Sequence, residues 1–371
     1  MLDGSVWAGV NRLVDSYLKP SERDEIVVVF TSDTYEEASW LSVALEQHNV
    51  SPKKVWMIPL RDPEFSSRLS AVLPDPSEIR GNLFVVTLEL ETLSHDDVLR
   101  SLLASYSPEI VKVYRAISAS GLLFSEGLRV TPDDLTARNT ALLERLMPAK
   151  RVRVTSKSGT DLRISFDSKR YRWISNRGVW RPGKFVILPA GEVATYPNSI
   201  DGVLVADFAF NVNVTTKLDA RLNHHPVKVW VEDSRAVRYE CENRVIRSFL
   251  DECFSTECSF QVGEVGFGTN FGVRDPVSLN SHINERHPGL HLGFGESNQS
   301  PEVVGYQCGI HLDLISTGGE VWFENDPIPL DLMNVKPSSS PHPRQTRDED
   351  AYSTDGSDGF DSDDCCGITP A

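Results

Sequence analysis

The chain has 371 residues, enough for two domains that each bury a core, and its composition is globular, with 40% hydrophobic and 24% charged residues. A formal net charge of −16 argues against nonspecific binding of nucleic acid, because phosphate contacts require clustered Lys and Arg. No run approaches the roughly 20 apolar residues of a membrane helix, and the N-terminus lacks a signal-peptide pattern, so we expect a soluble, cytoplasmic protein that does not bind membranes.

The first part of the chain alternates short apolar runs with helix-like segments. EIVVVFTSD (25–33), KKVWMIPL (53–60) and GNLFVVTLEL (81–90) each have the pattern of a buried strand with polar flanks. Between the first two, TYEEASWLSVALEQHN has apolar residues at helical spacing, and Asp33 or Thr34 can cap this helix. Strand, helix and strand at this spacing predict a parallel sheet. We therefore predict an α/β domain over residues 1–148, with no glycine-rich motif that would indicate a nucleotide site.

The pattern changes near residue 149. Val152 and Val154 alternate with arginines, SKSGTD has the composition of a turn, and DLRISF alternates again, which predicts a hairpin. Short strands and glycine-containing turns continue from there, and 242–253 is the one clear helical stretch. We therefore predict that the α/β domain is followed by an α+β domain, 149–335, with a mixed or antiparallel sheet.

Residues 336–371 have a different composition. They contain eight acidic residues against three basic ones, many Ser, Pro and Gly, and few aliphatic side chains. Such a segment cannot bury enough apolar surface to order itself, so we predict a disordered acidic tail.

The six cysteines include no CxxC pair, and two of them are adjacent in the predicted tail. This usage fits neither a disulfide framework nor a thiolate zinc site. We therefore predict reduced thiols.

QCGIHLDLI (307–315) combines an imidazole and a carboxylate on an otherwise apolar strand. His311 and Asp313 are two residues apart, so on a strand both side chains point to one face, while Leu312 and Leu314 point to the other. An apolar strand that carries a charge on its second face is a candidate for a functional site.

Three more stretches of the second domain place possible metal ligands beside glycine-rich turns. They are LPAGEVATYPNSIDGVLVAD with Glu192, VGEVGFGTN with Glu264, and GLHLGFGESN with His291. Burying several carboxylates together is prohibitive unless a cation neutralises them. With His311 and Asp313 the set has three carboxylates and two imidazoles, a charge that two divalent cations balance closely. Asp, Glu and His without Cys suit zinc, cobalt, manganese or iron.

These motifs, in this order, resemble the aminopeptidase T type of metallopeptidase, also called thermophilic leucyl aminopeptidases. The likeness covers about residues 150–320, and the α/β N-terminal half agrees with that family's architecture. The resemblance implies a hydrolase acting on a peptide or amide through two divalent metal ions (Zn, Co or Mn), commonly as a homodimer. Carried over residue by residue, the implied metal ligands are Glu192, Glu264, His291, His311 and Asp313.

One position departs from that family. Its catalytic tyrosine, seven residues after the histidine of the third motif, is replaced here by Asn298, which cannot act as an acid or base. Glu296 is our candidate for a substitute catalytic proton carrier, with a solvated loop residue as the alternative, and Tyr306 is a further residue within possible reach. Loss of the tyrosine keeps open a non-catalytic, peptide-binding protein that serves peptide natural-product biosynthesis.

A second family offers a different function. VTSKSGTDL (154–162) and GEVATYPN (191–198) resemble segments of the 2,5-dihydroxypyridine dioxygenases, ring-cleaving enzymes of the same fold that also end in an HLD motif. This resemblance implies one Fe(II) ion held by His311, Asp313 and either His291 or Glu264. On ligands the chain follows the peptidases, because the dioxygenases have His at position 264 and lack the glutamate at position 192. The hydrolase is our leading prediction, and the peptide-binding protein and the dioxygenase are the alternatives.

Overall fold

The computed structural model describes residues 3–344 and 346 and divides into two compact units. In the described residues, the first unit comprises 3–132 and Gly178–Ala190, and the second comprises Asp133–Arg177, 191–344 and 346. Along this part of the chain, no helix is both long and apolar enough to cross a bilayer.

This division differs from the predicted boundary at residue 148 in two places. Helix α5 (Pro132–Leu146) belongs to the second unit, because Leu142, Leu143 and Leu146 are fully buried in that unit's core. Strand β8 (Phe185–Leu188) comes from the predicted second domain but pairs in parallel with a strand of the first unit.

The described part of the first unit is built on a five-stranded parallel sheet, which confirms the predicted α/β class. Its strand order is β2–β1–β3–β4–β8, with bounds Lys53–Trp56, Glu25–Phe30, Leu83–Leu88, Val111–Ala116 and Phe185–Leu188. Every residue of β3 is buried, as expected for a parallel strand with both faces covered.

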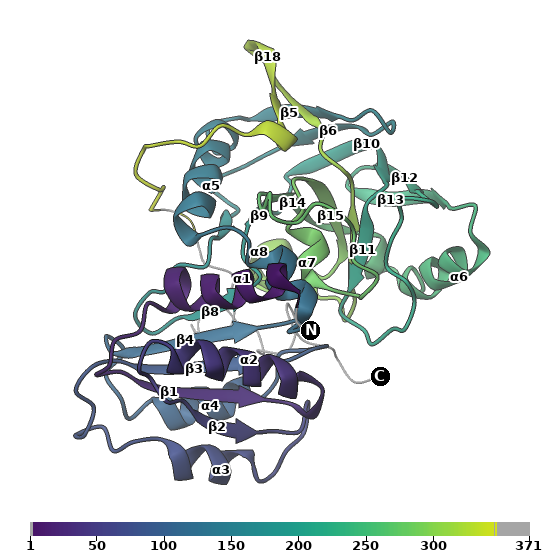
Figure 1. Cartoon of the computed structure of the whole chain (residues 1–371). Coiled ribbons are helices and arrows are strands. Elements are labelled where there is room, and N and C mark those ends of the chain that lie inside the picture. The colour runs from purple at the N-terminus through teal and green to yellow at the C-terminus, as the bar shows by residue number, and fades with distance from the viewer. Residues whose placement is uncertain (1–2, 345, 347–371) are drawn as a thin grey trace. The chain divides into compact units, whose positions relative to one another are not determined.

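Helices cover this sheet (Figure 1). They are α1 (Gly4–Arg12), α2 (Tyr35–Glu46), α3 (Phe65–Val72) and α4 (Asp96–Leu103), together with the π-helical turns Leu13–Leu18 and Leu123–Gly127. Helices α3 and α4 contribute Phe65, Leu69 and Leu99 to a buried cluster with Val27 and Val85 of the sheet. Helix α2 begins one turn later than the strand ends, after a capping box at Thr31.

The second unit contains two antiparallel sheets among its described residues. The seven-stranded sheet has the order β13–β12–β10–β6–β5–β17–β18, with bounds Arg235–Glu240, Val227–Glu232, Ser199–Ala206, Asp161–Ser165, Arg151–Thr155, Glu320–Phe323 and Asp326–Asp331. The six-stranded sheet has the order β11–β16–β15–β14–β9–β7, with bounds Ala209–Val212, His311–Ile315, Gly289–Gly295, Val262–Gly268, Glu192–Thr195 and Ile174–Asn176. The predicted hairpin is confirmed, because β5 pairs with β6.

One core lies between these two sheets. Successive side chains of a strand point to opposite faces, so every second residue along the strands of each sheet points into this core. The seven-stranded sheet contributes Val152, Val154, Leu162 and Ile164, and the six-stranded sheet contributes Val265, Phe267, Leu290, Leu292, Leu312 and Leu314. Helix α6 (Arg244–Cys253) begins after Asn243, whose side chain accepts the N–H groups of Val245 and Ile246. The six-stranded sheet therefore has a second face that is free to carry polar groups.

The remaining described helices of the second unit are short. They are α7 (His282–Glu285), α8 (Pro301–Val304) and the 3-10 turns Cys258–Phe260 and Leu332–Asn334. The predicted disordered tail lies outside the described residues except for 336–344 and 346, where the N–H of Ser338 donates to the main-chain oxygen of Ala137 on α5.

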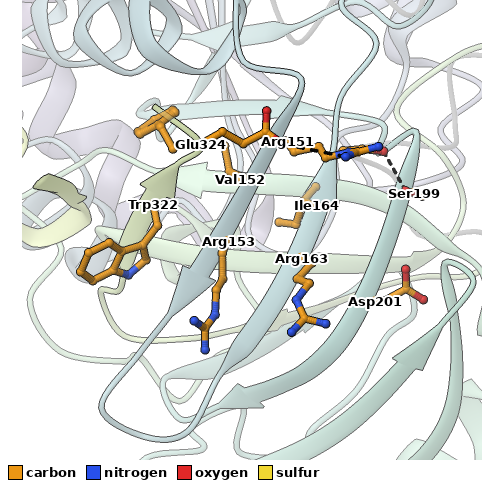
Figure 2. A pocket seen from close by; sticks show the side chains of 11 residues that line it. Arg151, Val152, Arg153, Arg163, Ile164, Ser199, Asp201, Trp322 and Glu324 are labelled. Atoms are coloured by element: carbon orange, nitrogen blue, oxygen red, sulfur yellow. Dashed lines mark hydrogen bonds and ion pairs between the residues drawn. The ribbon is translucent and has the colours of Figure 1, made fainter. Parts of the chain in front are cut away.

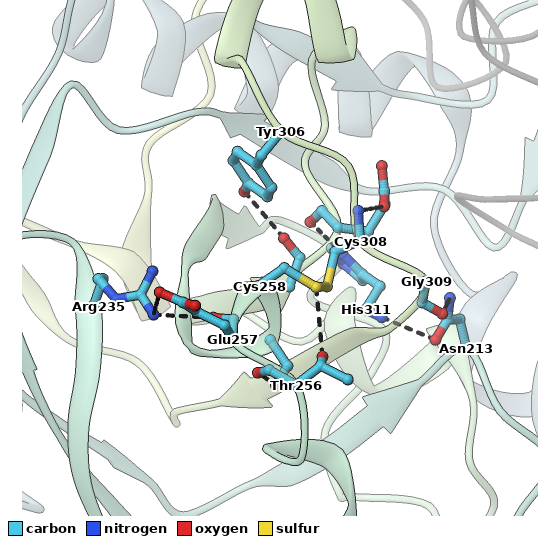
Figure 3. The surroundings of a disulfide bond; sticks show 12 residues. Asn213, Arg235, Thr256, Glu257, Cys258, Tyr306, Cys308, Gly309 and His311 are labelled. Carbon is cyan, nitrogen blue, oxygen red and sulfur yellow. Dashed lines mark hydrogen bonds and ion pairs between the residues drawn. A yellow bond between two sulfur atoms is a disulfide. The ribbon is translucent and has the colours of Figure 1, made fainter.

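The prediction of reduced cysteines is wrong for two of the six. Cys258 and Cys308 form a disulfide, with Cα atoms 5.7 Å apart although 50 residues separate them in the chain (Figure 3). Sequence spacing cannot reveal such a pair, because the fold brings together the turn before β14 and the loop before β16. Cys241 and Cys253 are buried free thiols, and Cys365 and Cys366 lie outside the described residues.

Candidate metal centre

The five predicted metal ligands lie on four neighbouring strands of the six-stranded sheet. Glu192 begins β9, Glu264 is in β14, His291 is in β15, and His311 and Asp313 are in β16. The leucines that alternate with them are buried in the core between the sheets, so the ligands share the opposite face. The structure thus brings together five side chains that extend in the sequence from Glu192 to Asp313, and every one is at least nine-tenths buried.

Close polar contacts connect these side chains. Nε2 of His291 lies 2.9 Å from Oε1 of Glu192 and 3.4 Å from Oε1 of Glu264. Nε2 of His311 lies 3.2 Å from Oδ2 of Asp313. Both imidazoles therefore direct Nε2 towards carboxylate oxygens, which is the arrangement expected of side chains that surround a cation.

Two groups of three residues are compact enough to hold a metal ion. In Glu192–Glu264–His291, and again in Glu264–His311–Asp313, each residue offers one ligand atom and the three atoms lie within 4.8 Å of one another. Glu264 belongs to both groups. A carboxylate has two oxygens, so a shared glutamate is suited to contact two cations at once.

Glycines make room for these ligands on the neighbouring strands. Gly293 stands opposite Glu264 on one side and Asp313 on the other. A Cβ atom at Gly293 would lie 2.7 Å from Cε1 of His311 and 2.9 Å from Cβ of Glu264, closer than side chains tolerate. Gly293 on β15 therefore leaves the space that the side chains of His311 and Glu264 occupy.

Helix α7 and the residue that follows it contribute two charged side chains that are not among the predicted ligands. Glu285 and Arg286 are buried, and Nη1 of Arg286 contacts Oε2 of Glu192 and lies 3.5 Å from Oε2 of Glu285. The side-chain amide of Asn211, on strand β11, donates to Oε1 of Glu285. A signal was present in the sequence, because the charged pair directly precedes the third motif in NERHPGLHLGFG.

The pKa values in this cluster diverge because groups of both signs share a buried space. Burial raises the pKa of Glu192, but Arg286 and His291 outweigh it and lower this pKa to about 2. Burial and the neighbouring carboxylate of Asp313 raise the pKa of Glu285 well above its usual value. Burial opposes protonation of His291, but Glu192 and the other carboxylates around it raise its pKa well above the ordinary range.

A test of metal fit is the hydrogen bonding of the buried ligand atoms. Within the described part of the chain, Oδ1 of Asp313 is buried and has no hydrogen-bond partner. A buried carboxylate oxygen without a donor is costly unless a cation contacts it. Together with the shared Glu264 and a donor set of oxygens and imidazole nitrogens, this atom fits a site for divalent cations.

Glu296, the predicted proton carrier, is buried and engaged with the main chain. Its carboxylate accepts the N–H of Cys308 at 2.8 Å, and its main-chain oxygen lies 3.0 Å from Nδ1 of His311. The second contact assigns the proton to Nδ1 and leaves the Nε2 lone pair of a neutral His311 available to a cation. Glu296 therefore orients a predicted ligand.

Asn298 and Tyr306 also lie near this region, with defined contacts. Oδ1 of Asn298 accepts the side-chain amide of Gln299 at 2.9 Å, and Nδ2 of Asn298 is buried with no partner among residues 3–344. The hydroxyl of Tyr306 donates to the main-chain oxygen of Gly295 at 3.0 Å. This hydrogen bond holds the Tyr306 side chain at the end of β15.

A hollow of about 490 Å³ lies elsewhere, on the seven-stranded sheet. Figure 2 shows Arg153, Arg163 and Trp322 in it, on neighbouring strands, with Asp201 beyond Arg163. None of the predicted metal ligands lines this hollow. Arg153 is paired with Asp161 at 2.7 Å, and Nη1 of Arg151 lies 3.9 Å from Oε1 of Glu324.

Comparison with known proteins gives two relationships. The sequence profile of the 2,5-dihydroxypyridine 5,6-dioxygenase family matches residues 126–274, which include Glu192 and Glu264 but end before the other three predicted ligands. The fold is similar to that of a 2,5-dihydroxypyridine dioxygenase from Pseudomonas putida KT2440, with a TM-score of 0.59, 14% identity, and coverage of 92% of this chain and 98% of that one. No curated protein sequence matches the chain significantly.

The fold is also similar to that of AmpT from Thermus thermophilus. The TM-score is 0.52 at 12% identity, and the alignment covers 88% of this chain and 97% of AmpT. Both families whose motifs the sequence resembles therefore include a solved structure with a similar fold, and the low identities indicate a divergent relationship.

Proposed function

We propose that this chain is a metal-dependent hydrolase of the aminopeptidase type, acting on a peptide or amide at a site for two divalent cations. The proposal rests on the position of Glu264, because this residue belongs to both ligand groups. A carboxylate between two three-ligand groups is the arrangement that a dinuclear hydrolase needs. The likeness to AmpT supports the same class.

The donor set favours this function over a mononuclear iron oxygenase. Each of the two groups contains one imidazole and two carboxylates. Non-haem iron oxygenases commonly use two histidines and one carboxylate around one metal, and neither group has that composition. The dioxygenase is nevertheless our second candidate, because its family profile matches residues 126–274 and its structure shares the fold.

Bound cations would polarise the substrate carbonyl and lower the pKa of a bound water. The chain's own residues do the rest. Glu192, Glu264 and Asp313 balance the cations' charge, His311 is oriented by the main-chain oxygen of Glu296, and Arg286 holds one oxygen of Glu192. Asn298 cannot carry a proton, which leaves a peptide-binding protein without hydrolysis as the outcome to be tested.

The experiment combines metal content with two assays. Full-length protein is stripped with a chelator, reconstituted separately with Zn²⁺, Co²⁺, Mn²⁺ or anaerobic Fe²⁺, and analysed for metal per chain. Aminoacyl amides and short peptides are tested for hydrolysis, and 2,5-dihydroxypyridine for oxygen uptake. We expect two metals per chain and hydrolysis that the E264Q variant abolishes.

Two results would overturn the proposal. One Fe²⁺ per chain with oxygen uptake would establish the dioxygenase. Peptide binding without shortening in any of the four metals would establish a non-catalytic binding protein. The R153A variant, altered on the other sheet, is the matched control and should behave as wild type in every assay.

A further inference from the structure

Arg286 places a permanent positive charge against one of the predicted metal ligands. The residue is fully buried, and Nη1 of its guanidinium contacts Oε2 of Glu192 and lies 3.5 Å from Oε2 of Glu285. Its main-chain oxygen accepts the N–H of Asn270 at 2.9 Å, which fixes the backbone at this position. A guanidinium remains charged at every pH at which the protein folds.

Among the described residues, the guanidinium of Arg286 forms an ion pair with a carboxylate of only one of the two ligand groups. In Glu192–Glu264–His291, the carboxylate of Glu192 is already paired with Arg286. In Glu264–His311–Asp313, the ion-pair partner of Asp313 is His311, and no lysine or arginine of the described residues pairs with either carboxylate. A cation entering the first group therefore meets a ligand whose charge is partly offset, whereas a cation entering the second does not.

We propose that Arg286 makes the two cation sites unequal, so that Glu264–His311–Asp313 fills first and tightly and Glu192–Glu264–His291 fills second and weakly. This inference rests on the proposed two-cation function and concerns the order in which its sites fill. The same guanidinium keeps the buried Glu192 neutralised while the second site is empty, which removes the cost of an unpaired buried carboxylate. Arg286 thus permits a stable state with one cation bound.

Arg286 also orients the ligand that it weakens. Because it holds Oε2 of Glu192, the other oxygen, Oε1, faces His291 at 2.9 Å. Arg286 is therefore a positioning residue that acts on the metal site through Glu192.

The test is a calorimetric titration of chelator-treated, full-length protein with Co²⁺ at one pH. We expect two binding steps that differ in affinity by about tenfold or more, as charge coupling between neighbouring buried groups implies. The E192Q variant should lose the weaker step and keep the tighter one. The D313N variant should lose the tighter step.

The direct test of Arg286 is a matched pair of variants. Arg286→Met removes the charge, and we expect it to strengthen the weaker step by about tenfold or more, whereas Arg286→Lys keeps the charge and should leave that step weak. Equal affinity of the weaker step in both variants would overturn the inference. If Arg286→Met does not fold, the wild type, E192Q and D313N decide, because two equal steps or loss of the tighter step in E192Q would also overturn it.

Failure of the inference and failure of the proposed function give different results. Two equal Co²⁺ steps with hydrolysis intact would remove the inference alone. A single Co²⁺ step in the wild type that becomes two steps in Arg286→Met would support the inference and exclude a two-cation hydrolase in the wild type. No Co²⁺ binding in any variant would overturn both.

Discussion

Gly266 lies directly opposite His291 on neighbouring antiparallel strands, and a Cβ atom at Gly266 would stand 1.9 Å from Nε2 of the imidazole. The glycine therefore creates the space in which this ring faces the two glutamates. At this position the absence of a side chain is a requirement of the site, and the requirement is steric rather than conformational, because Gly266 has no positive φ.

The G266A variant should lose cation binding at the group that contains His291. The added methyl group forces the ring away from Glu192 and Glu264, and overpacking of this kind costs about 1–3 kcal/mol of folding free energy. Calorimetry with Co²⁺ and thermal unfolding measure the two effects. The matched control is G309A, where an added Cβ would meet nothing within 4 Å. Unchanged cation binding in G266A would contradict the assignment of His291.

Substitution of Glu296 separates a proton carrier from a positioning residue. In E296Q the amide oxygen can still accept the N–H of Cys308, so we expect hydrolysis within about threefold of wild type, whereas loss of a general acid or base costs about 100-fold or more. E296A leaves that N–H unpaired and should lower the free energy of unfolding by about 1–3 kcal/mol. A large loss of hydrolysis in E296Q with normal cation binding would establish Glu296 as the catalytic residue.

Most of the correct predictions from the sequence rest on the pattern of apolar and polar residues along each strand. Leucines at 312 and 314 show which face of β16 is buried, and this fixes His311 and Asp313 on the other face without further information. Valine-rich runs flanked by polar residues predicted β1 and β3 for the same reason, because burial on both faces leaves a continuous apolar stretch.

Features that depend on distant parts of the chain were not predicted. Helix α7 has four residues, too few for a hydrophobic period, so the signal for its Glu285 and the adjacent Arg286 is their place directly before the third motif. Strand β8 follows strands of the second unit in the sequence but belongs to the first unit, where it pairs with β4. The local sequence of a strand does not show which sheet it joins. The disulfide joins two cysteines whose proximity exists in three dimensions alone.

Removal of the Cys258–Cys308 disulfide should destabilise the second unit. The bond closes a loop of 50 residues, and a cross-link of that length contributes about 2–4 kcal/mol by restricting the unfolded chain. Urea unfolding of the wild type with and without reductant, and of the C258S/C308S double variant, measures this difference. Reductant should shift the wild type and leave the double variant unchanged. Equal unfolding midpoints under all conditions would show that the disulfide does not contribute to stability.

Cation binding should release protons, and the affinity should therefore fall as the pH falls. Burial lowers the pKa of His311, but Asp313 beside it raises this pKa well above its usual value, and burial raises the pKa of Glu264. A group whose pKa is higher in the folded than in the unfolded protein stabilises the cation-free fold at pH values below its unfolded-state pKa. This stabilisation is lost as the pH rises through its folded-state pKa. Cations must displace the same protons, so the increase in Tm on adding Co²⁺ should grow between about pH 6 and 9. Titrations in buffers of different ionisation enthalpy count the protons, and an observed enthalpy independent of the buffer would contradict the protonated cluster.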